Sequence, residues 1–179
     1  MSESDYREDL KRPFIAYGVD ENDIHFLNTF AEDHESSKRK IENSDVVFLV
    51  GSDVDDVMDG IEDLDLVQVF KQYTGTVMGA SAGALVQMDE FRSEREDGGY
   101  RKGLGIVSGI DLDIHYEENE EHLKHIIDVL ETRRDQILVL PNKGGIVVSG
   151  ISVDFMGSAF LFDMTHLDEL YRAYQTYLV

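Results

Sequence analysis

The sequence predicts an α/β fold: a mostly parallel sheet flanked by helices, with a C-terminal antiparallel extension. Residues 45–51 and 137–140 form continuous apolar runs, as in strands buried on both faces of a parallel sheet. Helical stretches alternate with these runs, which is the pattern of an α/β domain. At 179 residues, the chain is long enough to bury a core, and we expect one domain over residues 1–179.

The first half of the chain is expected to begin with a polar, frayed segment and to reach its first buried strand near residue 45. Residues 13–18 fit either a short helix that begins at proline or a strand. The further elements expected here are a strand over 24–30, a helix over 32–40, a helix from 53 to 58 interrupted by Gly60, and a helical stretch over 64–70.

The second half is expected to contain one long helix among short strands. Residues 118–134 carry Leu123, Ile126, Ile127 and Leu130 at helical spacing, with acids at the start and arginines at the end. The other elements expected are a loop or loose hairpin over 91–102, short strands over 104–107 and 110–114, three turn-separated strands over 146–148, 151–155 and 159–162, and a last helix capped by Thr165.

The composition narrows the classes of function. A formal net charge of −21 disfavours binding to nucleic acid or to anionic membranes. The absence of cysteine excludes disulfides, a thiolate nucleophile and cysteine-ligated metal. No apolar run is long enough to span a bilayer and no signal peptide opens the sequence, so we expect a cytoplasmic protein without cofactors.

A Gly-x-Ser-x-Gly motif lies where a strand is expected to turn into a helix. In Gly79-Ala-Ser81-Ala-Gly83, an apolar run precedes the motif and helix-compatible residues extend to about Met88. This pattern is typical of a nucleophile elbow, a tight turn that exposes a serine hydroxyl above a sheet. Glycine is expected on both sides of Ser81 because a Cβ atom there would collide with its surroundings. The same pattern also fits a small-residue loop where a helix packs closely on a strand.

A serine nucleophile needs a base, and His115 is the best placed of six histidines. It ends an apolar strand, and the ends of strands are where sites assemble in α/β sheets. His122 and His125 lie one helical turn apart near Glu118 and Glu121, which could form a metal site. A solvated helix face is the favoured interpretation of that spacing, and we expect no metal.

Four segments in this order resemble peptidase family S51, which includes aspartyl dipeptidase (peptidase E) and cyanophycinase. They are Asp45-Val-Val-Phe-Leu-Val-Gly51-Ser-Asp53, Met78-Gly-Ala-Ser-Ala-Gly-Ala84, Gly103-Leu-Gly105 and Asp113-Ile-His115-Tyr116. The resemblance extends from about residue 13 to the C-terminus. It implies a fold similar to class I glutamine amidotransferases, which is flavodoxin-like.

The resemblance also implies roles for individual residues. Ser81 would be the nucleophile and His115 the general base. The backbone N–H groups of Ser52 and Ala82 would form the oxyanion hole, usually the largest electrostatic contribution in such chemistry.

Two departures from the family concern the chemistry. The family has Gly-Gly-Asn where this chain has Gly51-Ser52-Asp53, which would place a carboxylate near the oxyanion unless Asp53 faces away. The family also has an acid in the loop that here reads Pro141-Asn142-Lys143-Gly144-Gly145. Asn142 is expected to orient His115 through its amide oxygen instead.

A third departure concerns assembly, and one further expectation concerns the substrate. The chain begins at what resembles the family's first helix, so the usual first strand is expected to be missing. Its place could be filled by a rearranged N-terminus, by a partner chain in a homodimer, or not at all. Arg92, and with it Arg95 and Arg101, could hold an acidic group of the substrate.

The sequence therefore predicts a serine-type peptidase or amide hydrolase that acts on a small peptide through an acyl-enzyme on Ser81. The alternative is a catalytically weak or inactive relative that binds a ligand or a partner. The altered loop after Gly51 and the amide at Asn142 are the features that favour the alternative.

Overall fold

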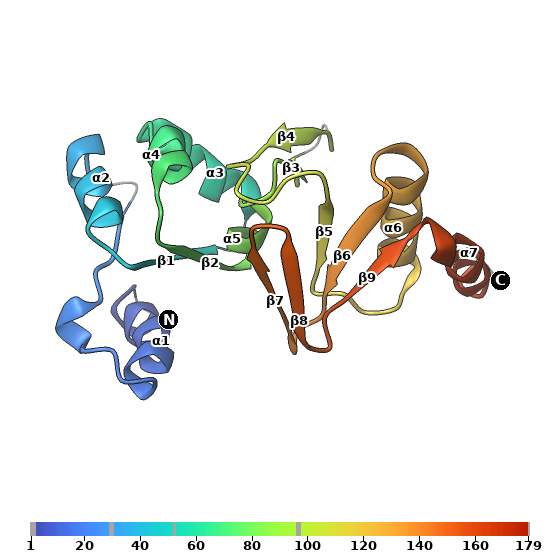
Figure 1. Cartoon of the computed structure of the whole chain (residues 1–179), viewed down its shortest axis with the longest axis horizontal. Helices are drawn as coiled ribbons and strands as arrows, with labels where there is room; N and C mark the ends of the chain where they lie inside the picture. Colours follow the sequence, from blue (N-terminus) through green and yellow to red (C-terminus); the bar gives the residue numbers. More distant parts are fainter. Residues whose placement is uncertain (1–2, 29–30, 52, 96–97, 179) are drawn as a thin grey trace.

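The computed structural model describes residues 3–28, 31–51, 53–95 and 98–178. It has the expected α/β character, with helices distributed along the whole chain (Figure 1). The described strands form four small sheets, in the orders β1-β2, β3-β4, β5-β6-β9 and β7-β8. β1 pairs with β2 and β5 with β6 in parallel, whereas the other pairs are antiparallel. The single, mostly parallel sheet that we expected is therefore divided.

The N-terminal part is helical and contains no strand among its described residues. Its elements are α1 (Glu3–Ala16), η1 (Glu21–Asp23) and α2 (His34–Glu42). The fraying expected over residues 1–8 is wrong for residues 3–8, which belong to α1, and residues 1–2 lie outside the described part. The strand expected over 24–30 is also wrong for residues 24–28; residues 29–30 lie outside the described part. Lys40 Nζ, rather than a neighbouring strand, donates to the Phe26 carbonyl at 2.7 Å.

The parallel pair β1 (Val46–Gly51) and β2 (Thr76–Ser81) carries the elbow at its carboxyl end. Helices α3 (Val54–Asp63) and α4 (Val67–Gln72) connect the two strands. The expected interruption at Gly60 is wrong, since α3 continues through it. Side chains from the helices and strands form one apolar core.

The second parallel pair holds the histidine of the candidate site. β5 (Asp111–Ile114) and β6 (Gln136–Leu140) are connected by α6 (Glu120–Thr132), and β9 (Phe160–Asp163) extends the sheet antiparallel to β6. Helix α7 (Leu167–Gln175) packs against α6. The side chain of Asp163, not the expected Thr165, caps the 3-10 turn η2 (Met164–His166) before α7.

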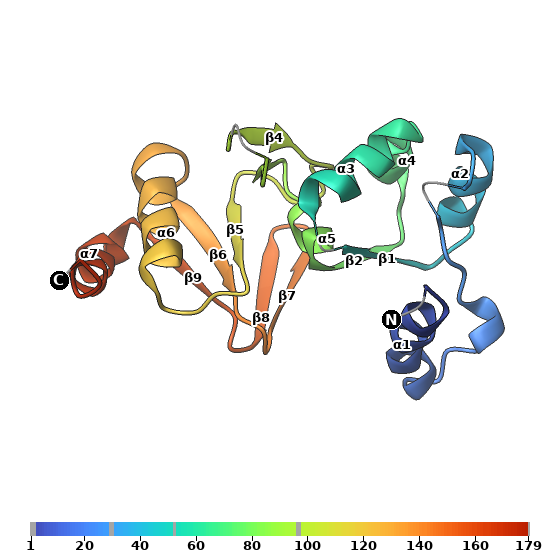
Figure 2. The ribbon, with the colours of Figure 1, turned by 180° about the vertical axis from the view of Figure 1, so that it is seen from behind.

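Two hairpins lie on opposite sides of the region between the parallel pairs (Figures 1 and 2). They are β3–β4 (Glu90–Arg92 and Tyr100–Lys102) and β7–β8 (Gly144–Ser149 and Ser152–Gly157). The first is the loose hairpin that was one of the two expectations for residues 91–102. The strand expected over 104–107 is wrong: Gly105 has a φ of 69°, and Val107 forms a single bridge to Met88.

A shared core joins the two halves of the chain and brings the ends of β2 and β5 together. Ala84 and Met88, which follow the elbow, pack with Leu112 of β5 and Leu138 of β6. All four side chains are buried. This packing holds the serine of one parallel pair near the histidine of the other.

The outer edge of β1 is where a second chain could pair in the possible homodimer. Within the described residues, β1 pairs with β2 alone, and none of its six residues is buried despite the apolar sequence. A dimer remains a prediction. Light scattering coupled to size-exclusion chromatography is expected to give twice the mass of 20.3 kDa, and the monomer mass would contradict it.

Among the described residues, the helices are all too short or too polar to cross a membrane.

Candidate active site

The serine of the motif lies at a tight turn between a strand and a helix. β2 ends at Ser81 and α5 (Ala82–Leu85) begins at the next residue. Ser81 has φ 54° and ψ −125°, a conformation that non-glycine residues rarely adopt. Strain of this kind is typical of functional sites, where the surrounding structure must hold it. The helix after the turn is a single turn, shorter than the expected helix to Met88.

The two glycines of the elbow are required by close backbone approach. A Cβ atom at Gly79 would lie 2.1 Å from the carbonyl oxygen of Gly83, and a Cβ atom at Gly83 would lie 1.9 Å from the carbonyl oxygen of Leu49. Both obstacles are backbone atoms, which a side-chain rotation cannot move. The turn can therefore pack on β1 because both positions lack a side chain.

Replacing Gly83 with alanine is expected to lower the free energy of unfolding by about 3 kcal/mol, because β1 and α5 must separate to admit the methyl group. Urea unfolding measures the loss. Gly99→Ala is the matched control, since a Cβ atom there meets no atom within 4 Å. Equal stability of the two variants would show that the contact at Gly83 is relieved without cost.

His115 reaches the serine from the end of β5. Its Nε2 lies 2.8 Å from Ser81 Oγ, which is hydrogen-bond distance. His115 also has a positive φ of 54°. Two of the three non-glycine residues with positive φ in the described chain are thus the two members of this pair.

Asn142 completes a chain of three side chains. It lies in the turn between β6 and β7, which a bond from Gly144 N to the Pro141 carbonyl closes. Asn142 Oδ1 is 2.6 Å from His115 Nδ1. An amide oxygen at this position accepts from Nδ1–H, which leaves the Nε2 lone pair facing the serine hydroxyl. That is the tautomer a general base requires.

The structure describes only one of the two residues expected to donate to the oxyanion. Ala82 is the first residue of α5, and an N–H at this position has no partner within the helix. Ser52 lies outside the described residues. Asp53 caps α3 by accepting from Asp56 N at 3.0 Å, so its carboxylate is directed to its own helix.

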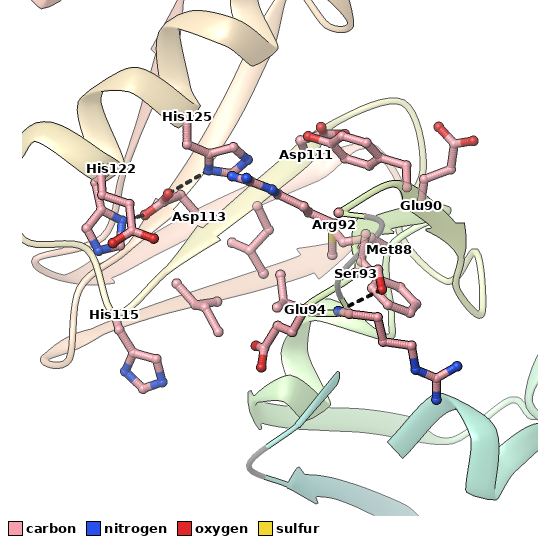
Figure 3. Close-up of a pocket in the computed structure, with 18 residues that line it drawn as sticks. Met88, Glu90, Arg92, Ser93, Glu94, Asp111, Asp113, His115, His122 and His125 are labelled. Carbon is pink, nitrogen blue, oxygen red and sulfur yellow. Dashed lines mark hydrogen bonds and ion pairs between the residues drawn. The ribbon is translucent and has the colours of Figure 1, made fainter. Parts of the chain in front are cut away.

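A pocket of about 480 Å³ opens beside His115, a size suited to a small ligand. The hairpin β3–β4, strand β5 and helix α6 line it (Figure 3). Charged side chains of both signs face it, including Arg92, Glu94 and Glu121. A ligand here could therefore be held by ion pairs close to the Ser81–His115 pair.

The three arginines proposed for the substrate have different environments. Arg95 and Arg101 both pair with Asp59, and Arg101 also pairs with Asp55 at 2.7 Å. They are thus paired within the protein, which disfavours them as the groups that hold an acidic substrate. Arg92 forms no ion pair within the described chain and extends across the pocket towards His125 (Figure 3).

His122 and His125 bind a carboxylate that sequence reasoning missed. Their Nδ1 atoms lie 2.8 and 2.9 Å from the two oxygens of Asp113, whose side chain is 4% exposed. Asp113 lies on β5, two residues before His115, and this alternation along the strand was the available signal. Among the described residues, no group of three or more histidine, aspartate or glutamate side chains is arranged to hold a metal ion.

Asp55 fixes the hairpin that forms one wall of the pocket. It is 1% exposed and accepts from Ser93 Oγ, Glu94 N and Arg101 Nη1. Burial alone would raise the pKa of Asp55, but the hydrogen bonds from Arg101 and Ser93 outweigh it and hold that pKa below its usual value. The ionised carboxylate is therefore the form that the fold stabilises.

Asp55→Asn is expected to lower the free energy of unfolding at pH 7 by about 3 kcal/mol, because it leaves the Arg101 guanidinium without its buried partner. The depressed folded pKa means that this stabilisation is present above about pH 4 and is lost as pH falls through the folded pKa. Urea unfolding from pH 7 to pH 3 should show the two proteins converging. Exposed Asp56→Asn serves as the control, and a difference that persists at low pH would contradict the charge assignment.

This chain is similar in sequence to one peptidase family and in structure to solved proteins. The sequence model for peptidase family S51 matches residues 1–156. A peptidase E protein from Listeria monocytogenes EGD-e has a similar structure, with a TM-score of 0.60 and 15% identity over 73% of this chain and 68% of that chain. A peptidase from an acI-B1 actinobacterium gives a TM-score of 0.59 and 17% identity over 74% of this chain and 58% of its own. No curated protein matches the sequence.

Proposed function

This chain belongs to peptidase family S51, and on that premise we propose that it is a serine-type peptidase or amide hydrolase acting on a small peptide. The observation that carries the proposal is the 2.8 Å contact between Ser81 Oγ and His115 Nε2. A hydroxyl becomes a competent nucleophile when such a base removes its proton during attack. The pocket beside His115 offers room for a small peptide.

The reaction follows from the roles of these atoms. Ser81 Oγ attacks the scissile carbonyl while its proton passes to His115 Nε2, and the carbonyl oxygen becomes an oxyanion. The N–H groups of Ala82 and Ser52 would stabilise that charge. His115 then protonates the leaving amine as the C–N bond breaks, and an acyl-enzyme remains on Ser81. Water, activated by the same imidazole, releases the acid and restores the serine.

Asn142 supports the orientation of the base but not its charge. Its amide oxygen, 2.6 Å from Nδ1, favours the productive tautomer of His115. It carries no negative charge to stabilise the imidazolium formed during attack. We therefore expect slow turnover compared with a site that has a carboxylate at this position.

Arg92 is the residue we assign to an acidic group of the substrate. Its guanidinium extends into the pocket, whereas Arg95 and Arg101 are held by Asp59. A free guanidinium binds a carboxylate in bidentate fashion, with a strong preference for planar anions.

A fluorophosphonate probe tests the proposal without knowledge of the substrate. We expect a single adduct on Ser81, located by mass spectrometry, that is absent in Ser81→Ala and strongly reduced in His115→Ala. His34→Asn is the matched control, because His34 binds the Leu64 carbonyl far from the pair. If the folded wild-type protein remains unlabelled at Ser81, the hydrolase assignment is wrong.

The second candidate function is a weakly active or inactive family member that binds a ligand or a partner. One observation favours it: the side chain on His115 Nδ1 is an amide rather than a carboxylate. The labelling experiment separates a protein that only binds, which would leave Ser81 unmodified, from a slow hydrolase, in which Ser81 would still be labelled.

A further inference from the structure

Glu94 is presented to the pocket by a rigid backbone. Its N–H donates to Asp55 Oδ2 at 2.8 Å, and the preceding Ser93 hydroxyl binds both oxygens of the same carboxylate at 2.9 and 3.1 Å. Asp55 and Ser93 are buried, with exposures of 1% and 5%. The start of the Glu94 side chain is therefore fixed, although the carboxylate itself is accessible to ligands.

The Glu94 carboxylate has no cationic partner among the described residues, although arginines lie close in sequence. Arg95 pairs with Asp59, and Arg101 pairs with Asp55, Asp59 and Glu62. Figure 3 shows the Glu94 carboxylate extending towards the side of the pocket where His115 lies. Arg92, two residues earlier, extends to the opposite wall beside His125. Among the described residues that line the pocket, Arg92 is a cation without an ion pair, and Glu94 and Glu121 are carboxylates without one. Of these two carboxylates, Glu94 is the one whose backbone is held by Asp55.

The surroundings of Glu94 favour a cation that the protein does not supply. Glu94 is exposed overall, but partial desolvation by its neighbours, followed by the charges of Asp53 and Asp55, raises the pKa of its carboxyl group. An external ammonium group beside this carboxylate would relieve the repulsion and restore the charged form. The carboxylate would then gain a charge-assisted hydrogen bond, which is stronger than one between neutral groups.

We propose that Glu94 is a specificity residue that binds an ammonium group of the substrate next to the scissile bond. This inference rests on the proposed function, because it assigns a contact within the same site. The α-ammonium of the residue that acylates Ser81 is two bonds from the attacked carbonyl carbon, so it would lie on the side of the pocket where His115 and Glu94 face each other. A lysine ammonium is the same chemical group, but it lies several bonds farther from that carbon.

Matched phosphonate probes test the inference. Diphenyl 1-aminoethylphosphonate places a free α-ammonium beside the phosphorus that reacts with a serine, and its N-acetyl derivative lacks the charge. We expect the free amine to modify Ser81 about tenfold faster or more in the wild-type protein, as a hydrogen bond between charged groups predicts. Glu94→Gln should reduce this ratio to about one. The corresponding phosphonate analogue of lysine, acetylated on its α-nitrogen, carries only the side-chain ammonium. It shows whether that group can replace the α-ammonium.

The control variant is Glu117→Gln, because Glu117 is an exposed carboxylate close to His115 in sequence that does not line the pocket. It should retain the wild-type preference for the free amine. A preference that survives Glu94→Gln unchanged, or no preference in the wild type, overturns the inference while labelling of Ser81 still supports the hydrolase. Loss of all labelling in the wild type overturns the proposed function as well, so the two failures are distinguishable.

Discussion

Asn142→Asp is expected to raise kcat by at least about 10²-fold and by up to about 10⁴-fold, the factor lost when serine proteases exchange this carboxylate for an amide. Asn142 Oδ1 already lies 2.6 Å from His115 Nδ1, so the substitution changes charge without moving the contact. A carboxylate stabilises the imidazolium that forms when Ser81 attacks. It also accepts through either oxygen, whereas an amide that rotates would present its NH₂ group and favour the wrong tautomer. Steady-state kinetics on a peptide amide measure the gain.

Two companion variants make the result specific. Asn142→Ala should fall below the wild type, because His115 loses its orienting acceptor. Asn142→Asp in a His115→Ala background should give no gain, because the new carboxylate would have no imidazolium to stabilise. An unchanged kcat in a variant that unfolds at the same urea concentration would mean that Asn142 does not act through His115.

The hydrogen-bonded chain Ser81–His115–Asn142 could be predicted because short motifs and the family resemblance mark its members. Ser81 lies between glycines that a tight turn requires, and His115 follows an apolar strand. Asn142 occupies the turn after β6 where the family resemblance places an acid. Short motifs of this kind constrain the backbone directly, so the sequence shows them without knowledge of distant contacts.

The strands expected over 24–30 and 104–107 fail for a non-local reason. A strand needs a neighbour whose backbone is free to pair, and sequence alternation does not show whether one is available. In the described part of the chain, no strand pairs with residues 24–28, and Lys40 donates to the Phe26 carbonyl instead.

Side-chain partners were the least predictable feature of the site. Arg92, Arg95 and Arg101 are equivalent in sequence, but distant carboxylates on α3 occupy the last two. The helical spacing of His122 and His125 gave no hint that Asp113 accepts from both. These pairings connect elements far apart along the chain, so composition and periodicity contain little information about them.

Ser81→Ala is expected to lower kcat by only about 10²-fold in the wild-type protein. Removing the serine or the histidine of a complete triad costs about 10⁶-fold, and removing the acid alone costs about 10⁴-fold. This chain already lacks the acid, so the loss expected from Ser81→Ala is the ratio of these two factors, about 10²-fold. His115→Ala should cost a similar amount, and the double variant should be no slower than either single variant, because the pair acts as a unit. Single-turnover kinetics with purified protein measure these losses.

The loss from Ser81→Ala should therefore depend on residue 142. In an Asn142→Asp background it should grow from about 10²-fold to between about 10⁴-fold and about 10⁶-fold, in proportion to the gain in kcat, since the new carboxylate acts only through an intact serine–histidine pair. Gly99→Ala, outside the site and without a steric conflict, provides a background in which the loss should stay near 10²-fold. A loss from Ser81→Ala that is the same in all three backgrounds would show that Ser81, His115 and Asn142 are neighbours without being a catalytic unit. Coupling of the predicted size would instead mean that the site is a triad weakened by one amide.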